Sequence, residues 1–383
     1  MKDLNNLRIL NGMKPLKKQL KFMKRHIMEI DYITGPKTDE MYGVSKYQHE
    51  IHKRLSNINL NFINYNTSEF VINNIDFGNA FKSYLAYPLI VRKKINNDNI
   101  KHITSQSFAY LLKLNRLKNT IITCYDLIPW VYENNRSIPW KLNIMGLKMA
   151  DEIITISKFS KEDIIKILGF PEEKIHIVYP GVNTEIYFQN KNRDMLSKLN
   201  IDLNYKIILY VGSEQPRQNF DVLLKSFAKL KKKMPNTKLL KIGKAQAYGA
   251  RKKHLELIKK LKIMKDVIFI DYVPENELGK FYNCADLVVY PCSYAGFGLP
   301  PLEAMACGVP IITSNKSSLP EVVGNAGIMI DPRNIEKMFI EMFNVLKDAE
   351  MRNKMIKSGL KRAKTFNWDD SAKKTEKIYN DFK

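Results

Sequence analysis

The segment at residues 290–312 holds the densest group of residues that could bind a ligand, Tyr-Pro-Cys-Ser-Tyr-Ala-Gly-Phe-Gly-Leu-Pro-Pro-Leu-Glu-Ala-Met-Ala-Cys-Gly-Val-Pro-Ile-Ile. A strand is expected to end near Pro291, and two glycines then allow a flexible loop. The two adjacent prolines suit the start of a short helix, and Gly308 suits its end. Loops that follow parallel strands are where open α/β sheets bind their ligands, so this loop is the first candidate site.

Glu303 is the acid of this segment, and we expect it in the first turn of the helix, facing a cleft. A carboxylate there can accept hydrogen bonds from two vicinal hydroxyls, while the backbone amides of residues 297–299 remain for a phosphate. This combination suits a sugar nucleotide, with the ribose on Glu303 and the diphosphate on the loop. An acid that only complements the helix dipole, without any ligand, is the alternative interpretation.

A second loop, at residues 211–220, reads Val-Gly-Ser-Glu-Gln-Pro-Arg-Gln-Asn-Phe and joins an apolar run to an amphipathic segment. Gly212 allows a sharp turn, Arg217 offers a forked cation that can grip two phosphate oxygens, and Asn219 can cap the next helix. A strand, a loop and a helix start form an anion site, because free amides and the helix dipole point at the ligand. A plain surface turn is the alternative.

Short apolar runs and amphipathic segments alternate along the chain from residue 28 onward. Runs such as 207–211 and 287–290 have the length and β-branched content of buried strands, and amphipathic segments such as 222–230 lie between them. This alternation predicts an α/β protein with parallel sheets and helices on both faces. The pattern lapses into a polar stretch within residues 182–205, which marks a domain boundary.

Four segments are expected from this organisation. They are a basic amphipathic leader at 1–27, an N-terminal domain at 28–185, a C-terminal domain at 186–365, and a C-terminal helix at 366–383 that could pack back on the N-terminal domain. The leader carries eight Lys and Arg against one Asp, and apolar residues at mostly helical spacing follow Pro15. It could lie on anionic lipid head groups, pack on the protein, or be an extension upstream of a start at Met28.

The chain of 383 residues carries 62 Lys and Arg against 39 Asp and Glu, a formal net charge of +23. Such a surplus attracts the phosphates of nucleic acids or of membrane surfaces, although a solvated lysine-rich surface explains it equally well. No apolar stretch approaches the roughly 18 residues of a spanning helix, and no secretory signal is apparent. The cysteines form no Cys-x-x-Cys pair, so a cytoplasmic protein with buried free thiols is expected. They are Cys124, Cys284, Cys292 and Cys307.

The run at residues 296–310 closely resembles the signature of family 4 glycosyltransferases, also called glycosyl transferase group 1. The segments 150–157, 179–183 and 318–324 resemble further landmarks of this family, and the resemblance covers nearly all of residues 28–383. It implies a GT-B fold, in which two Rossmann-like, doubly wound parallel-sheet domains face a cleft. The N-terminal domain would then serve the acceptor and the C-terminal domain would bind the nucleotide sugar.

The resemblance also implies which residues form the site. The residues expected to take part in catalysis are Arg217, Glu303, Asp126 and Tyr125. The residues expected to contact the nucleotide sugar are Gly43, Gly212, Ser213, Arg217, Gln218, Lys244, Tyr272, Val273, Gly296, Phe297, Gly298, Leu299 and Glu303. The base would lie near the turn at residues 272–274.

Three positions depart from the family pattern. The family usually places two glutamates eight residues apart, and here the first is Ala295, which puts the orientation of the donor sugar in question. Gln218 replaces the usual lysine of the phosphate loop, and Tyr125 stands where a histidine is common. Lys244, after a neighbouring strand, could supply a compensating cation.

The activity implied is that of a retaining glycosyltransferase in polysaccharide biosynthesis. It would move a hexose-type sugar from a GDP-, UDP- or ADP-linked donor to a glycan or lipid-linked acceptor, without a metal or other cofactor. An anionic membrane surface is a further expected partner, peripheral to a cytoplasmic enzyme, whereas nucleic acid is not expected because no nucleic-acid fold signature is present. The alternative is a catalytically weakened member that acts as a partner subunit or nucleotide-sugar binder, favoured by Ala295 and Gln218.

Overall fold

The structure is a computed structural model, and it describes residues 28–36, 43–65, 71–72, 75–76, 81–190 and 192–382. The leader predicted at residues 1–27 lies outside the described residues. In the described part of the chain, no helix is both long and apolar enough to cross a membrane.

The N-terminal domain is built on a six-stranded sheet whose order is β2-β1-β5-β6-β7-β8, with every neighbouring pair parallel. The strands are β1 (Met28–Pro36), β2 (Ile58–Tyr65), β5 (Ile100–Ile103), β6 (Thr120–Cys124), β7 (Glu152–Thr155) and β8 (Ile175–Ile177). The chain first adds β2 on one side of β1 and then β5 on the other. The strand order therefore reverses between β1 and β5, where a doubly wound sheet opens a crevice for ligands.

The C-terminal domain contains a second parallel sheet, in the order β11-β10-β9-β12-β13-β14. Its strands are β9 (Lys206–Val211), β10 (Thr237–Ile242), β11 (Val267–Ile270), β12 (Leu287–Tyr290), β13 (Ile311–Ser314) and β14 (Ile328–Ile330). This is the order 3-2-1-4-5-6 of a Rossmann fold, and its reversal lies between β9 and β12. The prediction of two doubly wound parallel-sheet domains is confirmed.

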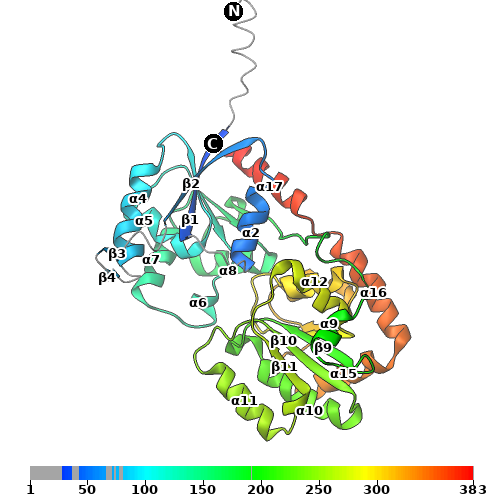
Figure 1. Cartoon of the computed structure of the whole chain (residues 1–383). Helices are drawn as coiled ribbons and strands as arrows, with labels where there is room; N and C mark the ends of the chain where they lie inside the picture. The colour runs from blue at the N-terminus through cyan, green and yellow to red at the C-terminus, as the bar shows by residue number, and fades with distance from the viewer. Residues whose placement is uncertain are drawn as a thin grey trace, which may run out of the picture.

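Helices cover both sheets, and the two domains lie one above the other in Figure 1. The N-terminal domain contains α2 (Gly43–His52), α4 (Tyr87–Lys94), α5 (Tyr110–Asn115), α6 (Ile128–Val131), α7 (Ile138–Leu147) and α8 (Lys158–Leu168), with the π turn η2 (Lys82–Ala86) before α4 and a short hairpin of β3 (Val71–Ile72) and β4 (Ile75–Asp76). The C-terminal half contains α9 (Asp194–Lys198), α10 (Phe220–Lys233), α11 (Ala250–Lys260), α12 (Glu275–Cys284), α13 (Leu299–Ala306), α14 (Leu319–Val323), α15 (Ile335–Lys347), α16 (Ala349–Ala363) and α17 (Trp368–Asp381).

The sequence explains these elements locally. The run Lys-Ile-Ile-Leu-Tyr-Val of β9 is buried at its four central positions, as expected for a strand covered on both faces. The next helix, α10, buries Phe220, Leu223, Leu224, Phe227 and Leu230 on one face. Three lysines in its last turn place positive charge at the negative end of the helix dipole, which stabilises the helix.

The last helix of the chain, α17, returns to the N-terminal domain and lies beside α2 (Figure 1). Asn367 caps its start by accepting from the amides of Asp369 (2.8 Å) and Asp370 (3.0 Å). Near its end, the hydroxyl of Tyr379 hydrogen-bonds to Nδ1 of His102 on β5. The other ring nitrogen of His102 lies 2.8 Å from Oγ1 of Thr123 on β6. The end of the chain is thus tied to the middle of the first sheet.

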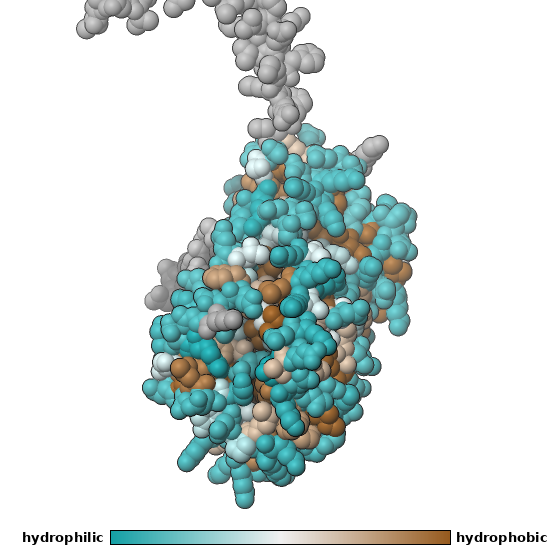
Figure 2. Space-filling view, turned by 90° about the vertical axis from the view of Figure 1, so that its right-hand side faces the viewer, coloured by the Kyte–Doolittle hydropathy of each residue, from teal (hydrophilic) through white to brown (hydrophobic). Residues whose placement is uncertain are grey.

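The face of the molecule shown in Figure 2 is largely hydrophilic, with apolar residues scattered among polar ones. The cysteines, in contrast, are all buried.

His102 predicts a pH dependence of stability. Burial lowers its pKa from 6.5 to about 3, so below pH 6.5 the unfolded chain takes up a proton that the folded chain does not. The contribution of His102 should be complete above pH 6.5 and fall toward pH 3, by up to about 1.4 kcal/mol per pH unit. Urea unfolding between pH 7 and pH 4 tests this: His102→Gln should be less stable at pH 7 but lose stability less steeply, and equal slopes would contradict it.

Candidate functional site

Two adjoining cavities lie between the domains, beyond the carboxyl ends of the strands. We name them after the roles expected from the sequence: the donor-side cavity, which Glu303 lines, has a volume of about 280 Å³, and the acceptor-side cavity, which Asp126 lines, has about 270 Å³. They share a wall made by Gly43, Arg217, Gln218, Leu299 and Pro300. The switch points of both sheets thus open toward one place, as the fold predicts.

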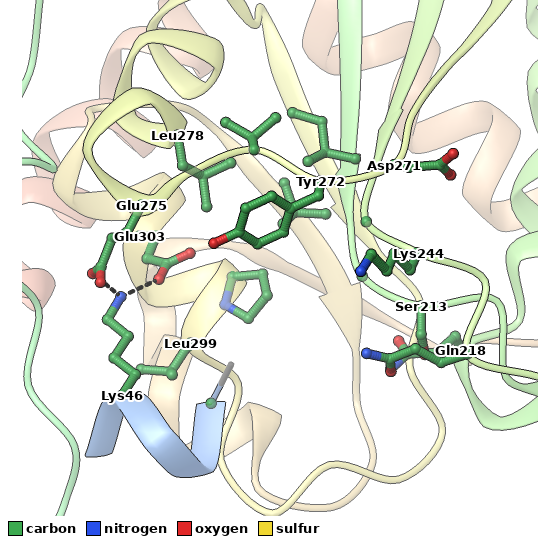
Figure 3. Close-up of a pocket in the computed structure, with 18 of the residues that line it drawn as sticks. Lys46, Ser213, Gln218, Lys244, Asp271, Tyr272, Glu275, Leu278, Leu299 and Glu303 are labelled. Atoms are coloured by element: carbon green, nitrogen blue, oxygen red, sulfur yellow. Dashed lines mark hydrogen bonds and ion pairs between the residues drawn. The ribbon is translucent and has the colours of Figure 1, made fainter. Parts of the chain in front are cut away.

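Every site residue predicted from the sequence lines one of these cavities. The donor-side cavity brings together Gly43, Gly212, Ser213, Arg217, Gln218, Lys244, Tyr272, Val273, Leu299 and Glu303. The acceptor-side cavity adds Tyr125, Asp126, Gly296, Phe297 and Gly298. In Figure 3, Glu303 lies on one side of Tyr272, and Ser213, Gln218 and Lys244 lie on the other.

Glu303 is held by one donor on each carboxylate oxygen. Its Oε1 lies 2.8 Å from Nζ of Lys46, and its Oε2 accepts a hydrogen bond of 2.9 Å from the hydroxyl of Tyr282. The helix α13 starts at Leu299, so Glu303 is its fifth residue. The expectation that Glu303 lies in the first turn was wrong, because the helix begins at Leu299, before the two prolines that were expected to open it, and directly after Gly298 in a left-handed conformation (φ 120°).

Lys46 was missed by the sequence prediction. It lies on α2 of the first domain, is only 5% exposed, and also forms an ion pair of 2.7 Å with Glu275 of α12. Its Nζ lies 4.6 Å from the centre of the Tyr187 ring. Burial lowers the pKa of Lys46, but the carboxylates of Glu303 and Glu275 outweigh it and raise the pKa above its ordinary value. In the sequence, Lys46 is only a lysine beside the apolar face of a predicted amphipathic helix. Lysines on protein surfaces commonly occupy such positions, so nothing marked this one as buried.

Arg217 joins the two loops that were singled out from the sequence. Its Nη1 donates to the carbonyl of Tyr294 (3.0 Å), and its Nη2 donates to Oε1 of Gln215 (2.9 Å). Its Nε is buried and has no hydrogen-bond partner in the described part of the chain. The guanidinium is therefore held in place at the shared wall, with the N–H of its Nε unused.

Asn219 does not cap α10, contrary to expectation. Its backbone is left-handed (φ 50°, ψ 36°), and its Nδ2 donates instead to the carbonyl of Pro291 (2.7 Å) and to Oγ of Ser293 (2.6 Å). The acceptors lie in the loop after β12, which folds against the loop after β9. The side chain of Asn219 therefore bonds to partners that are distant in sequence instead of capping the helix, and these bonds join the loop after β9 to the loop after β12.

Gln218 and Lys244 lie across the donor-side cavity from Glu303, on the other side of Tyr272 (Figure 3). Gln218 is buried and accepts from the hydroxyl of Tyr210 (3.3 Å), so no cation stands at this position of the loop. Lys244 lines the same cavity, and its Nζ lies 5.9 Å from the centre of the Tyr272 ring. The positive charges that line the donor-side cavity in the described residues are those of Lys46, Arg217 and Lys244.

A buried ionic cluster supports the loop after β9. Glu214 lies 2.8 Å from Nζ of Lys241, 2.7 Å from Nη2 of Arg251 and 3.1 Å from Nδ1 of His254. The side chains of Glu214 and Lys241 are fully buried. Burial raises the pKa of Glu214, but hydrogen bonds from His254, Arg251 and Lys241 outweigh it and lower the pKa to about 2. The carboxylate thus fixes the loop to α11 and to β10.

The loop at residues 295–298 is hydrogen-bonded by Ser318 of its own domain and lies in close contact with the N-terminal domain. Oγ of Ser318 donates to the carbonyls of Ala295 (2.8 Å) and Phe297 (2.6 Å). A Cβ added at Gly296 would lie 2.7 Å from the carbonyl oxygen of Tyr125, too close for any side chain. In the described structure, the amides of Phe297 and Gly298 donate to no protein acceptor, so they can meet an anion.

Asp126 is the acid that lines the acceptor-side cavity in the described residues. Burial raises its pKa, although a hydrogen bond from the amide of Ile128 and the charge of Arg217 act in the opposite direction. A perturbed carboxyl group in a cleft is typical of functional sites. Ala295, in the wall of the same cavity, offers no polar side chain.

The site contains no metal cluster in the described residues: no three His, Cys, Asp or Glu side chains are grouped so that they could hold an ion.

Comparison with known proteins agrees with this arrangement. Residues 44–186 match the model described as Glycosyltransferase Family 4, and residues 191–362 match that described as Glycosyl transferases group 1. O-antigen chain mannosyltransferase B of Escherichia coli is 31% identical over 241 residues, and the match spans 61% of this chain and 61% of that relative's length.

Solved structures share the fold at low sequence identity. Sucrose-phosphate synthase from Thermosynechococcus elongatus has a TM-score of 0.75 at 18% identity, covering 91% of this chain and 98% of that one. An Anabaena protein, HepE, solved in complex with UDP and glucose, has a TM-score of 0.74 at 14% identity, covering 92% and 99%. The predicted GT-B architecture is confirmed.

Replacing Glu214 with Gln should loosen the support of the phosphate loop. Lys241 would remain buried without its carboxylate, and we expect a loss of about 3 kcal/mol of unfolding free energy at pH 7. Because the folded pKa of Glu214 is about 2 against an ordinary 4.5, its contribution is complete above pH 4.5 and is lost as the pH falls toward 2.

Urea unfolding of wild type and Glu214→Gln at pH 7, 4.5 and 3 measures this difference, which should shrink across the acid range. The exposed pair of Glu277 and Lys280 on α12 gives a control, and Glu277→Gln should leave the midpoint nearly unchanged. A Glu214→Gln protein as stable as wild type at pH 7 would exclude the supporting role.

Proposed function

The chain belongs to the group 1 glycosyltransferases, and on that premise we propose that it transfers a hexose-type sugar from a nucleoside-diphosphate donor to a glycan or lipid-linked acceptor. The observation that carries the proposal is the convergence of Glu303, Arg217 and the loop at residues 295–298 on two adjoining cavities. The match covers about three fifths of the curated relative's length, so the activity of this chain is inferred rather than transferred from that relative.

The donor-side cavity has the groups that a nucleoside diphosphate requires. The carboxylate of Glu303 has about four lone-pair sites, and its two protein donors leave room for two ribose hydroxyls. Arg217 and Lys244 are suited to the diphosphate, and the amides of Phe297 and Gly298 offer further donors in the adjoining acceptor-side cavity. HepE, which has this fold, was solved with UDP, and UDP is therefore our first candidate donor nucleotide.

The proposed reaction retains the configuration of the transferred sugar. The bond between the anomeric carbon and the phosphate oxygen breaks, and its electron pair leaves with the diphosphate. The acceptor hydroxyl approaches the same face of the sugar, bonds to the anomeric carbon, and gives its proton to the departing phosphate oxygen. Arg217 and Lys244 would stabilise the charge that develops on the diphosphate, so no metal is required for this step.

The acceptor-side cavity would take the sugar and the acceptor. Tyr125 and Asp126 come from the loop after β6, and Gly43 opens α2 at the shared wall. The carboxyl of Asp126, whose pKa is raised by burial, offers oxygens that can accept hydrogen bonds from sugar hydroxyls. We place the acceptor, rather than the nucleotide, on this side because the carboxylate of Glu303 and the cation of Lys244 line only the other cavity.

A weakened enzyme that binds nucleotide sugars as a partner subunit is the second candidate. It is favoured by the uncharged, buried Gln218 in the phosphate loop and by Ala295 in the acceptor-side cavity, where relatives carry an acid. Donor-dependent sugar transfer by the purified chain would decide against this candidate.

Nucleotide binding is the first test. Thermal unfolding of the full chain is measured with UDP, GDP and ADP in turn, in the presence of EDTA. A nucleotide at about 100 times its dissociation constant should stabilise the protein by about 2.7 kcal/mol. Absence of a shift and of a calorimetric signal with all three nucleotides would refute the proposed donor site, and a shift abolished by EDTA would refute metal independence.

Arg217 is expected to matter more for turnover than for folding. Removing one group that stabilises developing charge typically lowers kcat by about 100- to 1000-fold, and we expect this of Arg217→Ala. Arg217→Lys keeps the charge but loses the fork, and it should recover part of the rate. Initial rates of donor consumption with each variant test this, and the exposed Arg333 supplies the control, since Arg333→Ala should behave as wild type.

A further inference from the structure

Lys46 is a buried charge that crosses from one domain to the other. It belongs to α2, in the N-terminal domain, but its ammonium group lies between Glu275 of α12 and Glu303 of α13 in the C-terminal domain. The distances from Nζ are 2.7 Å and 2.8 Å, and the Lys46 side chain is only 6% exposed (Figure 3).

A buried charge is costly unless it is paired with an opposite charge. Removing the ammonium group of Lys46 would therefore leave its two carboxylate partners buried without compensation. Here one ammonium faces two carboxylates that share it, and both carboxylates line the donor-side cavity. Without Lys46, Glu275 and Glu303 would repel each other. The position of the Glu303 carboxylate therefore depends on a side chain from the other domain.

The second contact of Glu303 fixes its orientation. Tyr282, which is fully buried, donates to Oε2, while Lys46 holds Oε1. With each oxygen held by one donor, the carboxylate cannot rotate freely, and its remaining lone pairs have a defined direction. Recognition of a hydroxyl requires an acceptor with a fixed direction, because hydrogen bonds weaken steeply away from linear geometry.

We propose that Lys46 is a positioning residue for ribose recognition, which balances the charge of Glu303 and Glu275 and sets the direction in which Glu303 accepts from the ribose hydroxyls. The inference rests on the proposed function, since it assumes that the donor-side cavity takes a nucleoside diphosphate. It makes the ribose site a product of both domains: Glu303 comes from one, and the group that orients it comes from the other.

The experiment compares three ligands by isothermal titration calorimetry: UDP, 2′-deoxy-UDP and inorganic pyrophosphate. Wild type should prefer UDP over its deoxy analogue by about 10- to 100-fold, as expected for a hydrogen bond to a charged group. In Lys46→Met this preference should fall to less than about threefold, while the affinity for pyrophosphate stays within about twofold of wild type. A structural defect alone would weaken all three ligands together.

A control lysine lies seven residues further along the chain, directly after the end of α2. Lys53 pairs with Glu50 outside both cavities, so Lys53→Met should retain the full preference for UDP. If Lys46→Met does not fold, as judged by circular dichroism and thermal unfolding, Lys46→Gln replaces it, with the same loss of preference expected. Glu275→Gln, which leaves Lys46 to Glu303 alone, should keep the preference.

The outcomes separate the two levels of inference. If wild type binds neither nucleotide nor pyrophosphate, the proposed donor site fails, and this inference fails with it. If wild type prefers UDP and Lys46→Met prefers it equally strongly, the role of Lys46 is overturned while the donor site stands. Loss of preference with pyrophosphate binding intact supports the positioning role.

Discussion

The close approach of the loop after β12 to the loop after β6 is the constraint on which the site depends. At Gly296 there is no room for a Cβ, because the carbonyl oxygen of Tyr125 would lie 2.7 Å from it. The hydroxyl of Ser160 reinforces this contact by donating to the carbonyl of Tyr125 (2.9 Å) and lying 3.4 Å from that of Gly296. Two loops from two separate sheets are thus held edge to edge, and Tyr125 and Gly296, which form that contact, line the acceptor-side cavity.

The loops around the cavities are held by side chains that hydrogen-bond to backbone or form buried ion pairs, and not by regular secondary structure. Ser318 holds the loop at residues 295–298, Asn219 ties the loops after β9 and β12 together, and Glu214 anchors the first of these to α11. Glu321 adds a link between domains, since its carboxylate accepts from the amides at the start of α8. Groups fixed in this way need little rearrangement when charge develops on a ligand, which is the physical basis of electrostatic catalysis.

The sequence predicted the parts of this site that depend on where strands end and loops begin. Glycines and prolines marked the loops, and β-branched runs marked the strands, so the α/β fold class and the two main loops followed, while the full set of lining residues came from the resemblance to the family. It could not predict the partners of Asn219, because a local cap and distant acceptors look alike in sequence. Lys46 was invisible for the same reason: its two carboxylates lie more than 200 positions away along the chain. Strand order was equally hidden, since periodicity does not say at which edge a strand joins.

The charge of the site differs from the charge of the chain. The chain carries +23, yet the donor-side cavity is lined by three cations, Lys46, Arg217 and Lys244, and by three acids, Asp271, Glu275 and Glu303. Lys46 is engaged by the two glutamates, and Asp271 pairs with Arg251 outside the lining. In the proposed binding mode, a diphosphate would meet the charges of Arg217 and Lys244, and a ribose would meet the oriented carboxylate of Glu303. With Gln218 uncharged, it is the separation of charges within the cavity, and not the surplus on the surface, that makes one end fit for phosphate and the other for hydroxyls.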